Sequence, residues 1–96
     1  MVFEWDEAKN RINREKHGLE FDAAFAFDWE NALMADRTRH GDGERRFAAI
    51  GLYAGKMPTV VFTKRDRNIR IISLRRSNRT EERAYEPAKE KSDTKS

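Results

Sequence analysis

Two adjacent arginines, Arg75 and Arg76, end a strongly apolar stretch of the chain. The planar fork of a guanidinium can bind two phosphate oxygens at once. Glu81 and Tyr85 follow and stand four residues apart, so a helix would place this carboxylate beside this phenol. Such groups suit chemistry on a phosphodiester, and we expect the active surface here.

Basic residues are concentrated around this stretch, although the chain as a whole is nearly neutral. It has 20 Lys and Arg against 17 Asp and Glu, a formal net charge of +3, which is a weak argument for a polyanionic partner. Between positions 64 and 76 the only acid is Asp66, and six residues are basic: Lys64, Arg65, Arg67, Arg70, Arg75 and Arg76. This local excess suits contact with phosphates.

The composition narrows the class of protein. The chain has no cysteine, which excludes disulfides, thiolate metal sites and a cysteine nucleophile. It begins with acidic and aromatic residues and has no apolar run that could span a membrane, so we expect a cytoplasmic protein. A chain of 96 residues fits one domain that buries about two-thirds of its surface, and its small core favours an oligomer or a tight complex.

The N-terminal region is predicted to form a strand and then a helix. Apolar and polar residues alternate over residues 2–5, Asp6 offers an N-cap, and Gly18 suits a left-handed residue that ends the helix after position 16 or 17. Apolar residues are scarce on this helix, so it should lie on the surface. One face carries a polar stripe, which either points at RNA or a partner or is simply solvated: Lys9, Asn13 and Lys16.

A second, short helix is predicted from the spacing of Phe21, Ala24 and Phe25, with both rings in the core. A strand over residues 32–36 and a polar loop over 37–44 follow. His40 in this loop could act as an acid or a base near neutral pH, although such loops are also common as solvated turns.

Three further strands are predicted over residues 46–53, 59–64 and 69–76. Short connections force them to pair antiparallel as a meander. Strict alternation sends the side chains of positions 75 and 76 to opposite faces unless a bulge intervenes. If Ile72 and Leu74 pack beneath the helices, Ser73 and Arg75 look out from the open face.

The C-terminal region combines a helix start with a charged tail. Asn78 and Glu81 have the form of a capping box, which predicts a helix from about position 79. Glu81 therefore has a capping duty available as well as a catalytic one. Pro87 disfavours further helix, and residues 87–96 have little to bury. We expect one domain over residues 1–86 and a disordered tail over 87–96.

Four blocks of this sequence, in their order and spacing, resemble the BrnT family, the toxins of BrnT/BrnA type II toxin-antitoxin pairs. Together they span residues 3–85. They are Phe3-Glu4-Trp5-Asp6 with Lys9, Asn13, Lys16, His17 and Gly18; Phe21 with Ala24; Gly43-Glu44-Arg45-Arg46-Phe47 to Ile50-Gly51; and Ile72-Ser73-Leu74-Arg75-Arg76 with Glu81 and Tyr85. Two positions depart from the family pattern: Glu20 stands where a small hydroxyl residue often caps the second helix, and Leu74 where a small residue is usual.

The resemblance implies an α+β, RelE-like fold. Its small antiparallel sheet would have the element order β-α-α-β-β-β-β-α, with two N-terminal helices packed on one face and a C-terminal helix. The resemblance also implies a ribonuclease that arrests translation and forms a hetero-oligomer with a neutralising BrnA-like antitoxin. The antitoxin carries the DNA-binding domain, so this chain would meet DNA only indirectly. We expect no cofactor, no metal and no membrane contact.

RNA cleavage by its own 2′-hydroxyl needs a base, cations beside the phosphate and an acid for the leaving oxygen. We expect Arg75 and Arg46 to bind the phosphate. The base is Glu81, Glu44 or His40, and either Tyr85 or His40 orients the RNA or supplies a proton. Further contacts with RNA are expected from Arg76, Ser73, Lys9, Lys16 and Arg65.

A competing hypothesis is that the protein has lost catalysis. It would then serve as a RelE-like binding partner or corepressor within a DNA-bound complex. The modest net charge and the absence of an unmistakable catalytic triad in the sequence favour this alternative.

Overall fold

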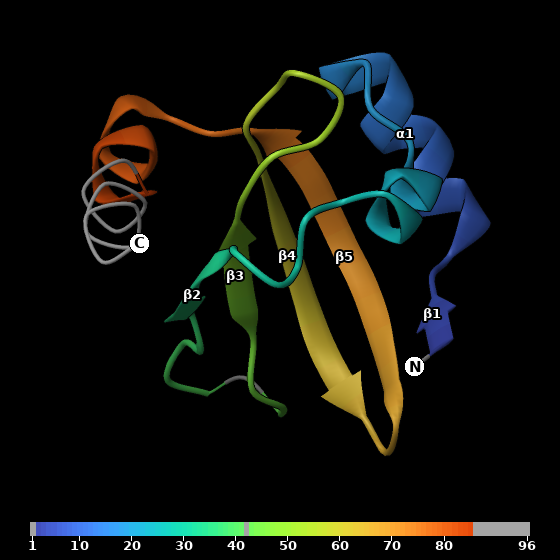
Figure 1. Cartoon of the computed structure of the whole chain (residues 1–96). Coiled ribbons are helices and arrows are strands. Elements are labelled where there is room, and N and C mark those ends of the chain that lie inside the picture. Colours follow the sequence, from blue (N-terminus) through green and yellow to red (C-terminus); the bar gives the residue numbers. More distant parts are fainter. Residues whose placement is uncertain (1, 42, 86–96) are drawn as a thin grey trace.

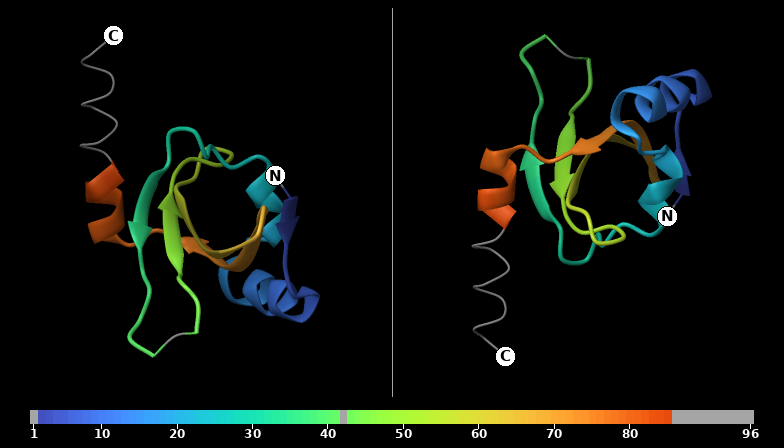
Figure 2. Two further views of the ribbon diagram at one scale, coloured as in Figure 1. Left: turned by 90° about the horizontal axis from the view of Figure 1, so that it is seen from below. Right: turned by 90° about the horizontal axis from the view of Figure 1, so that it is seen from above.

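A curled, five-stranded mixed sheet organises the chain (Figures 1 and 2). The computed structural model describes residues 2–41 and 43–85, so the predicted tail lies outside the described residues. In sheet order the strands are β1 (Val2–Glu4), β5 (Asn68–Arg76), β4 (Pro58–Arg65), β3 (Phe47–Ile50) and β2 (Leu33–Asp36). Two helices, α1 (Glu7–His17) and η1 (Phe21–Phe25), precede β2, and residues 79–85 are also helical.

The α+β class and the antiparallel meander of β3, β4 and β5 are confirmed. The expectation of a purely antiparallel sheet is wrong, because β1 pairs with β5 in parallel, with Val2 opposite Asn68 and Glu4 opposite Arg70. Residues 5–67 connect these two strands, so no tight turn dictates their relative direction. Strand β3 also ends earlier than predicted, at Ile50.

The first helix begins and ends where the sequence predicts. The carboxylate of Asp6 accepts a hydrogen bond from the backbone N–H of Ala8 (2.9 Å). At the other end, Gly18 has a φ of 71°, in the left-handed region, and its N–H donates to the carbonyl of Arg14 (2.8 Å). Both predicted caps are confirmed. None of the helices among the described residues is long and apolar enough to cross a membrane.

The second helix is a single 3₁₀ segment, not an α-helix. Phe21 is fully buried as predicted, but Phe25 is 67% exposed, so the expectation that both rings enter the core is wrong. Phe25 instead packs edge-on against the ring of Phe3 (5.1 Å between centroids). Glu20 provides no side-chain cap and pairs with Arg14 (3.0 Å). A helix of five residues without its own cap gains little from α-type hydrogen bonding.

The core lies on one face of the curled sheet. A β-bulge in β5 changes which of its side chains face this core. Val60 lies opposite Leu74 and Phe62 opposite Ile71, so β5 carries one extra residue, Ile72, between these pairs. The expectation that Ile72 packs with Leu74 is therefore wrong. Ile72 is half-buried. The buried apolar cluster comprises Leu19, Phe21, Ala23, Ala24, Phe27, Ala49, Val60, Phe62, Ile69, Ile71 and Leu74.

Helix α1 attaches to the sheet through two buried asparagines rather than through apolar residues. The side-chain amide of Asn13 donates to the carbonyls of Leu74 (2.7 Å) and Leu19 (2.9 Å), and its oxygen accepts from the N–H of Leu74 (3.1 Å). The oxygen of Asn10 accepts from the N–H of Phe21 (2.8 Å), which starts η1. The predicted polar stripe is thus divided, because Asn13 is structural whereas Lys9 and Lys16 are exposed.

Replacing Asn13 with alanine should lower the free energy of unfolding by about 3 kcal/mol, because three buried backbone groups lose their partner. Urea denaturation measures this loss. Asn31→Ala is the matched control, since the Asn31 side chain bonds only exposed groups of Asp28, and it should change stability little. Equal stabilities of the two variants would contradict the role of Asn13.

Candidate active site

Four arginines line a hollow of about 330 Å³ on the face of the sheet opposite the core. We call it the arginine hollow. Ser73 lies opposite Val61 and Arg75 opposite Thr59, so these side chains point away from the face that buries Val60 and Leu74. Its lining residues are Arg37, Arg39, Arg46, Ala48, Val61, Ile72, Ser73 and Arg75. Several guanidiniums around one cavity form a site for an anionic group.

Arg75 is held in place by a two-point ion pair. Its Nη1 and Nη2 donate to the two carboxylate oxygens of Glu81 at 2.7 and 2.9 Å. The Arg75 side chain is 33% exposed and that of Glu81 only 3%. The guanidinium is therefore fixed from behind by a buried acid while part of it still faces the hollow.

The same carboxylate caps the helical residues 79–85. Glu81 Oε1 accepts from the backbone N–H of Asn78 (2.9 Å), and the Glu81 N–H donates to Asn78 Oδ1 (2.8 Å), which is the predicted capping box. Below it, the hydroxyls of Thr59 and Ser77 share a buried hydrogen bond of 2.7 Å. One carboxylate thus joins the helix start to the guanidinium at the end of β5.

These contacts shift the ionisation of both partners. Burial raises the pKa of Glu81, but hydrogen bonds from Arg75, from the Asn78 backbone and from Thr59 outweigh it and hold the pKa below its ordinary value. The hydrogen bond to Glu81 raises the pKa of Arg75, against the opposing effect of its partial burial. Both groups are charged near neutral pH, and Glu81 is a weak proton acceptor there.

Tyr85, the other predicted residue on this helical segment, is also buried. Its exposure is 2%, equal to that of Glu81. Figure 2 shows the helical segment beyond β2, at the opposite end of the sheet from α1. In this conformation the Tyr85 and Glu81 side chains are out of reach of solvent.

The loop between β2 and β3 brings Arg37 and Arg46 to the hollow. The N–H of Arg37 donates to the carbonyl of Arg46 (2.8 Å), and the N–H of Arg46 donates to the Thr38 hydroxyl (2.9 Å). Beside them Asp36 and Arg45 form an ion pair. Hydrogen bonds from Arg45 and then Thr38 hold the pKa of Asp36 far below its usual range. These contacts close the base of the loop.

The other loop residues proposed for catalysis do not line the hollow. Glu44 pairs with Arg65 at 3.1 Å, and this hydrogen bond raises the pKa of Arg65. A predicted base and a predicted RNA contact are therefore partners of each other. His40 is exposed in the turn of the same loop, next in sequence to Arg39.

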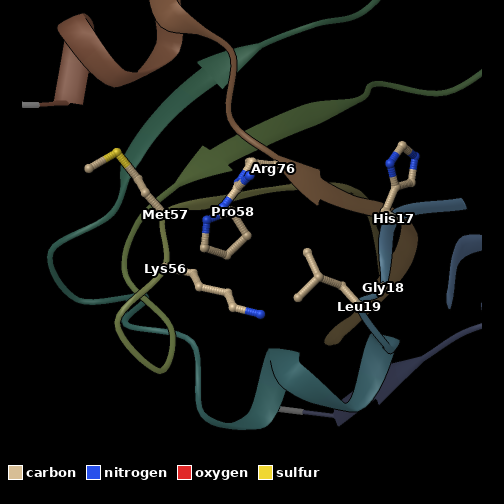
Figure 3. Close-up of a pocket in the computed structure, with 7 residues that line it drawn as sticks. All are labelled: His17, Gly18, Leu19, Lys56, Met57, Pro58 and Arg76. Atoms are coloured by element: carbon tan, nitrogen blue, oxygen red, sulfur yellow. The ribbon is translucent and has the colours of Figure 1, made fainter.

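The remaining predicted RNA contacts lie in two neighbouring hollows. Lys9 and Lys16 line a hollow of about 200 Å³ between α1 and β5, which Ser73 also lines. Arg76 lines a third hollow, of about 270 Å³, together with Lys56 (Figure 3). Arg75 and Arg76 thus line different cavities, in agreement with the alternation of side chains along the strand.

Three residues predicted from the sequence line the arginine hollow: Arg46, Ser73 and Arg75. The sequence analysis did not predict Arg37 and Arg39, which also line it. Both had been treated as part of a polar loop. Arg37 and Arg39 are two positions apart and directly follow a predicted strand. If the extended backbone continues, their side chains point to the same side, and this pattern could have predicted that they act together. Among residues 2–41 and 43–85, no group of three His, Asp or Glu side chains is placed to hold a metal ion.

Comparison with known proteins finds a protein family and solved structures that are similar to this chain. Residues 5–81 match the protein family described as "Ribonuclease toxin, BrnT, of type II toxin-antitoxin system". The crystal structure of the Brucella abortus ribonuclease toxin, BrnT, is 30% identical in sequence and superposes with a TM-score of 0.65, covering 82% of this chain and 100% of that one. No curated protein sequence matches the chain.

Glu81→Gln tests the ion pair through the pH dependence of stability. The pKa of Glu81 is lower in the folded than in the unfolded state, so its stabilisation is present above about pH 4.3 and is lost as the pH falls through the folded value. At pH 7 the variant should be less stable by about 2 kcal/mol, a figure reduced for the partial exposure of Arg75. The difference should shrink at pH 3.

Urea unfolding at both pH values measures this effect. Glu82→Gln is the matched control, because Glu82 is its exposed neighbour and should show no such pH-dependent difference. A Glu81→Gln deficit of the same size at pH 3 and pH 7 would contradict an ionised Glu81.

Proposed function

This chain belongs to the BrnT family of type II toxin-antitoxin ribonuclease toxins, and we propose that it is an endoribonuclease that cleaves RNA in the cytoplasm without a metal ion and so inhibits translation. The observation that carries this proposal is the arginine hollow. Arg75, Arg46 and Ser73 line it, and Glu81 holds Arg75 at hydrogen-bonding distance. These residues come from three separated parts of the chain.

The arginines supply the electrostatic part of the reaction. When the 2′-hydroxyl attacks the adjacent phosphorus, negative charge builds up on the non-bridging oxygens of the phosphate. Guanidinium groups placed before the attack stabilise this charge without having to reorganise. Arg75 presents a fork whose orientation is fixed by Glu81, and Arg46 lines the same cavity. Both therefore act as phosphate ligands.

Of the three candidate bases, the geometry favours His40. The Glu81 carboxylate is buried and already accepts hydrogen bonds from Arg75 and Asn78, so it is a positioning residue for Arg75. Glu44 is paired with Arg65. His40 is exposed beside the arginines of its loop, and an imidazole can both accept and donate a proton near neutral pH.

In this proposal a BrnA-like antitoxin neutralises the toxin by forming a hetero-oligomer with it. The family description supports an antitoxin partner. The antitoxin would carry the contact with DNA. The finer expectations of RelE-like packing and of a single domain over residues 1–86 belong to the same proposal.

Arg46→Ala should lower kcat/KM for RNA cleavage by about 10²-fold, because one donor to the developing charge is lost. Arg75→Lys should cause a loss of similar order, since lysine keeps the charge but not the fork. The assay follows cleavage of a labelled RNA in excess chelator and identifies a 2′,3′-cyclic phosphate on the product.

Arg67→Ala is the control for these variants, because Arg67 is exposed in the β4–β5 turn outside the arginine hollow, and it should cleave at the wild-type rate. Folding of each variant is checked by urea denaturation. Wild-type protein that needs added metal for cleavage would contradict the proposed chemistry. A protein that binds its antitoxin but cleaves no RNA would favour the non-catalytic corepressor.

His40→Gln should lower kcat by about 10²-fold or more while leaving the free energy of unfolding nearly unchanged, because the exposed imidazole contributes proton transfer and not packing. Single-turnover cleavage and urea denaturation provide the two measurements. Glu44→Gln is the comparison in the same loop and should retain most of the rate. If the two effects are reversed, Glu44 is the base.

A further inference from the structure

The arginine hollow is one end of a longer groove. The hollow lined by Lys9 and Lys16 shares Ile72 and Ser73 with the arginine hollow. It shares His17 with the third hollow, which contains Lys56 and Arg76. The shared lining residues make the three cavities neighbours, in the order from Arg75 past α1 to Lys56. We call these three cavities together the basic groove.

The described residues contribute no acidic side chain to the lining of the basic groove, although the chain has 17 Asp and Glu. Eight of the lining residues are lysine or arginine, and His17 is a further nitrogen base: Lys9, Lys16, Arg37, Arg39, Arg46, Lys56, Arg75 and Arg76. Eight of the 20 Lys and Arg of the chain thus line these neighbouring cavities, which favours a long polyanion.

Apolar surface alternates with these cations. Ile12 is 60% exposed and lies in the cavity between Lys9 and Lys16. The third hollow includes half-buried Met57 among its lining residues, together with the cations Lys56 and Arg76 (Figure 3). Bases of an unpaired strand can lie on such apolar surfaces while its phosphates meet the cations, whereas a duplex keeps its base faces stacked inside.

A fourth cavity lacks this combination of cations and apolar residues. It lies on the other face of the sheet and is lined by aromatic and aliphatic residues with Lys64 as its one cation: Trp29, Met34, Phe47, Phe62, Lys64 and Ile69. A nucleic acid would find apolar surface there but little charge for its phosphates.

We propose that an unpaired RNA strand several nucleotides long occupies the basic groove. Its scissile phosphate lies in the arginine hollow, and the flanking nucleotides cross α1 beside Lys9 and Lys16 to reach Lys56 and Arg76. Arg75 and Arg76 bind different phosphates of the same strand. The inference rests on the proposed ribonuclease function and assigns its substrate as single-stranded RNA engaged well beyond the cleaved bond.

Binding of an uncleavable strand tests the groove separately from catalysis. The probe is an unpaired oligonucleotide of about twelve nucleotides without 2′-hydroxyls, followed by fluorescence anisotropy over a range of salt concentrations. Lys9→Ala with Lys16→Ala should weaken binding about tenfold and reduce the slope of log K against log salt by about 1.4, or about 0.7 for each lost phosphate contact. Lys56→Ala with Arg76→Ala should act in the same direction.

The matched control removes the same charge elsewhere. Arg11 and Arg67 are exposed and line none of the three cavities, so Arg11→Ala with Arg67→Ala should bind the strand almost as the wild type does. Urea denaturation confirms that each pair is folded. Equal losses in the control and groove variants would overturn the proposal, and so would equal binding of a duplex of the same length.

Cleavage of two substrates supplies the second readout. The ratio of kcat/KM for a long RNA to that for a dinucleotide should fall about tenfold in the Lys9→Ala, Lys16→Ala variant, because only the long strand reaches α1. An unchanged ratio would overturn the groove. If the variant bound RNA normally but escaped its antitoxin, the surface would be a protein interface instead. If the wild type cleaved neither substrate, the ribonuclease proposal would fail while the anisotropy experiment still decided the groove.

Discussion

The carboxamide of Asn13 is the contact on which the arrangement of this protein depends. Strand β1 covers the edge of β5 only at residues 68–70, so the backbone at Leu74 needs another partner. Asn13 pairs with both the N–H and the carbonyl of Leu74, as a neighbouring strand would. It also binds the chain leaving α1 at Leu19. This one side chain fixes α1 against the residue that precedes Arg75.

The position of that contact also places the lysines. Lys9 and Lys16 lie one turn before and after Asn13 on α1, so all three occupy the same side of the helix. Because Asn13 is pinned to β5, the lysines must flank the strand beside Ile72 and Ser73, where the structure has them. The polar stripe predicted from the sequence therefore combines one buried structural amide with two exposed cations, and the amide orients the cations.

The bulge at Ile72 keeps Ser73 and Arg75 out of the core, where strict alternation along β5 would place them. Ile69 and Ile71 face the core, so regular alternation would turn Ser73 and Arg75 inward as well. A guanidinium in that core would be costly. One extra residue restores Leu74 to the core and turns Ser73 and Arg75 to the arginine hollow. No glycine or proline lies near Ile72 in the sequence to indicate a bulge, so the change in side-chain alternation along β5 could not be predicted.

Local features such as the caps of α1, the capping box and the short loops of the meander could be predicted, because each depends on neighbours in the chain. The pairing of β1 with β5 and the burial of Asn10 and Asn13 depend on partners far away, and the sequence did not predict them.

Glu81 caps the C-terminal helical segment and orients Arg75 with the same carboxylate. Oε1 accepts from both Asn78 and Arg75, and Oε2 accepts from Arg75. Capping fixes the carboxylate relative to the chain that leaves β5, and the carboxylate then fixes the fork of Arg75. Folding itself orients the guanidinium of Arg75, so this side chain would lose little conformational freedom on binding the proposed phosphate.

The contact between Glu81 and Arg75 also has an electrostatic consequence. Glu81 offsets part of the charge of Arg75, so the contribution of Arg75 to the hollow is chiefly the fixed direction of its guanidinium.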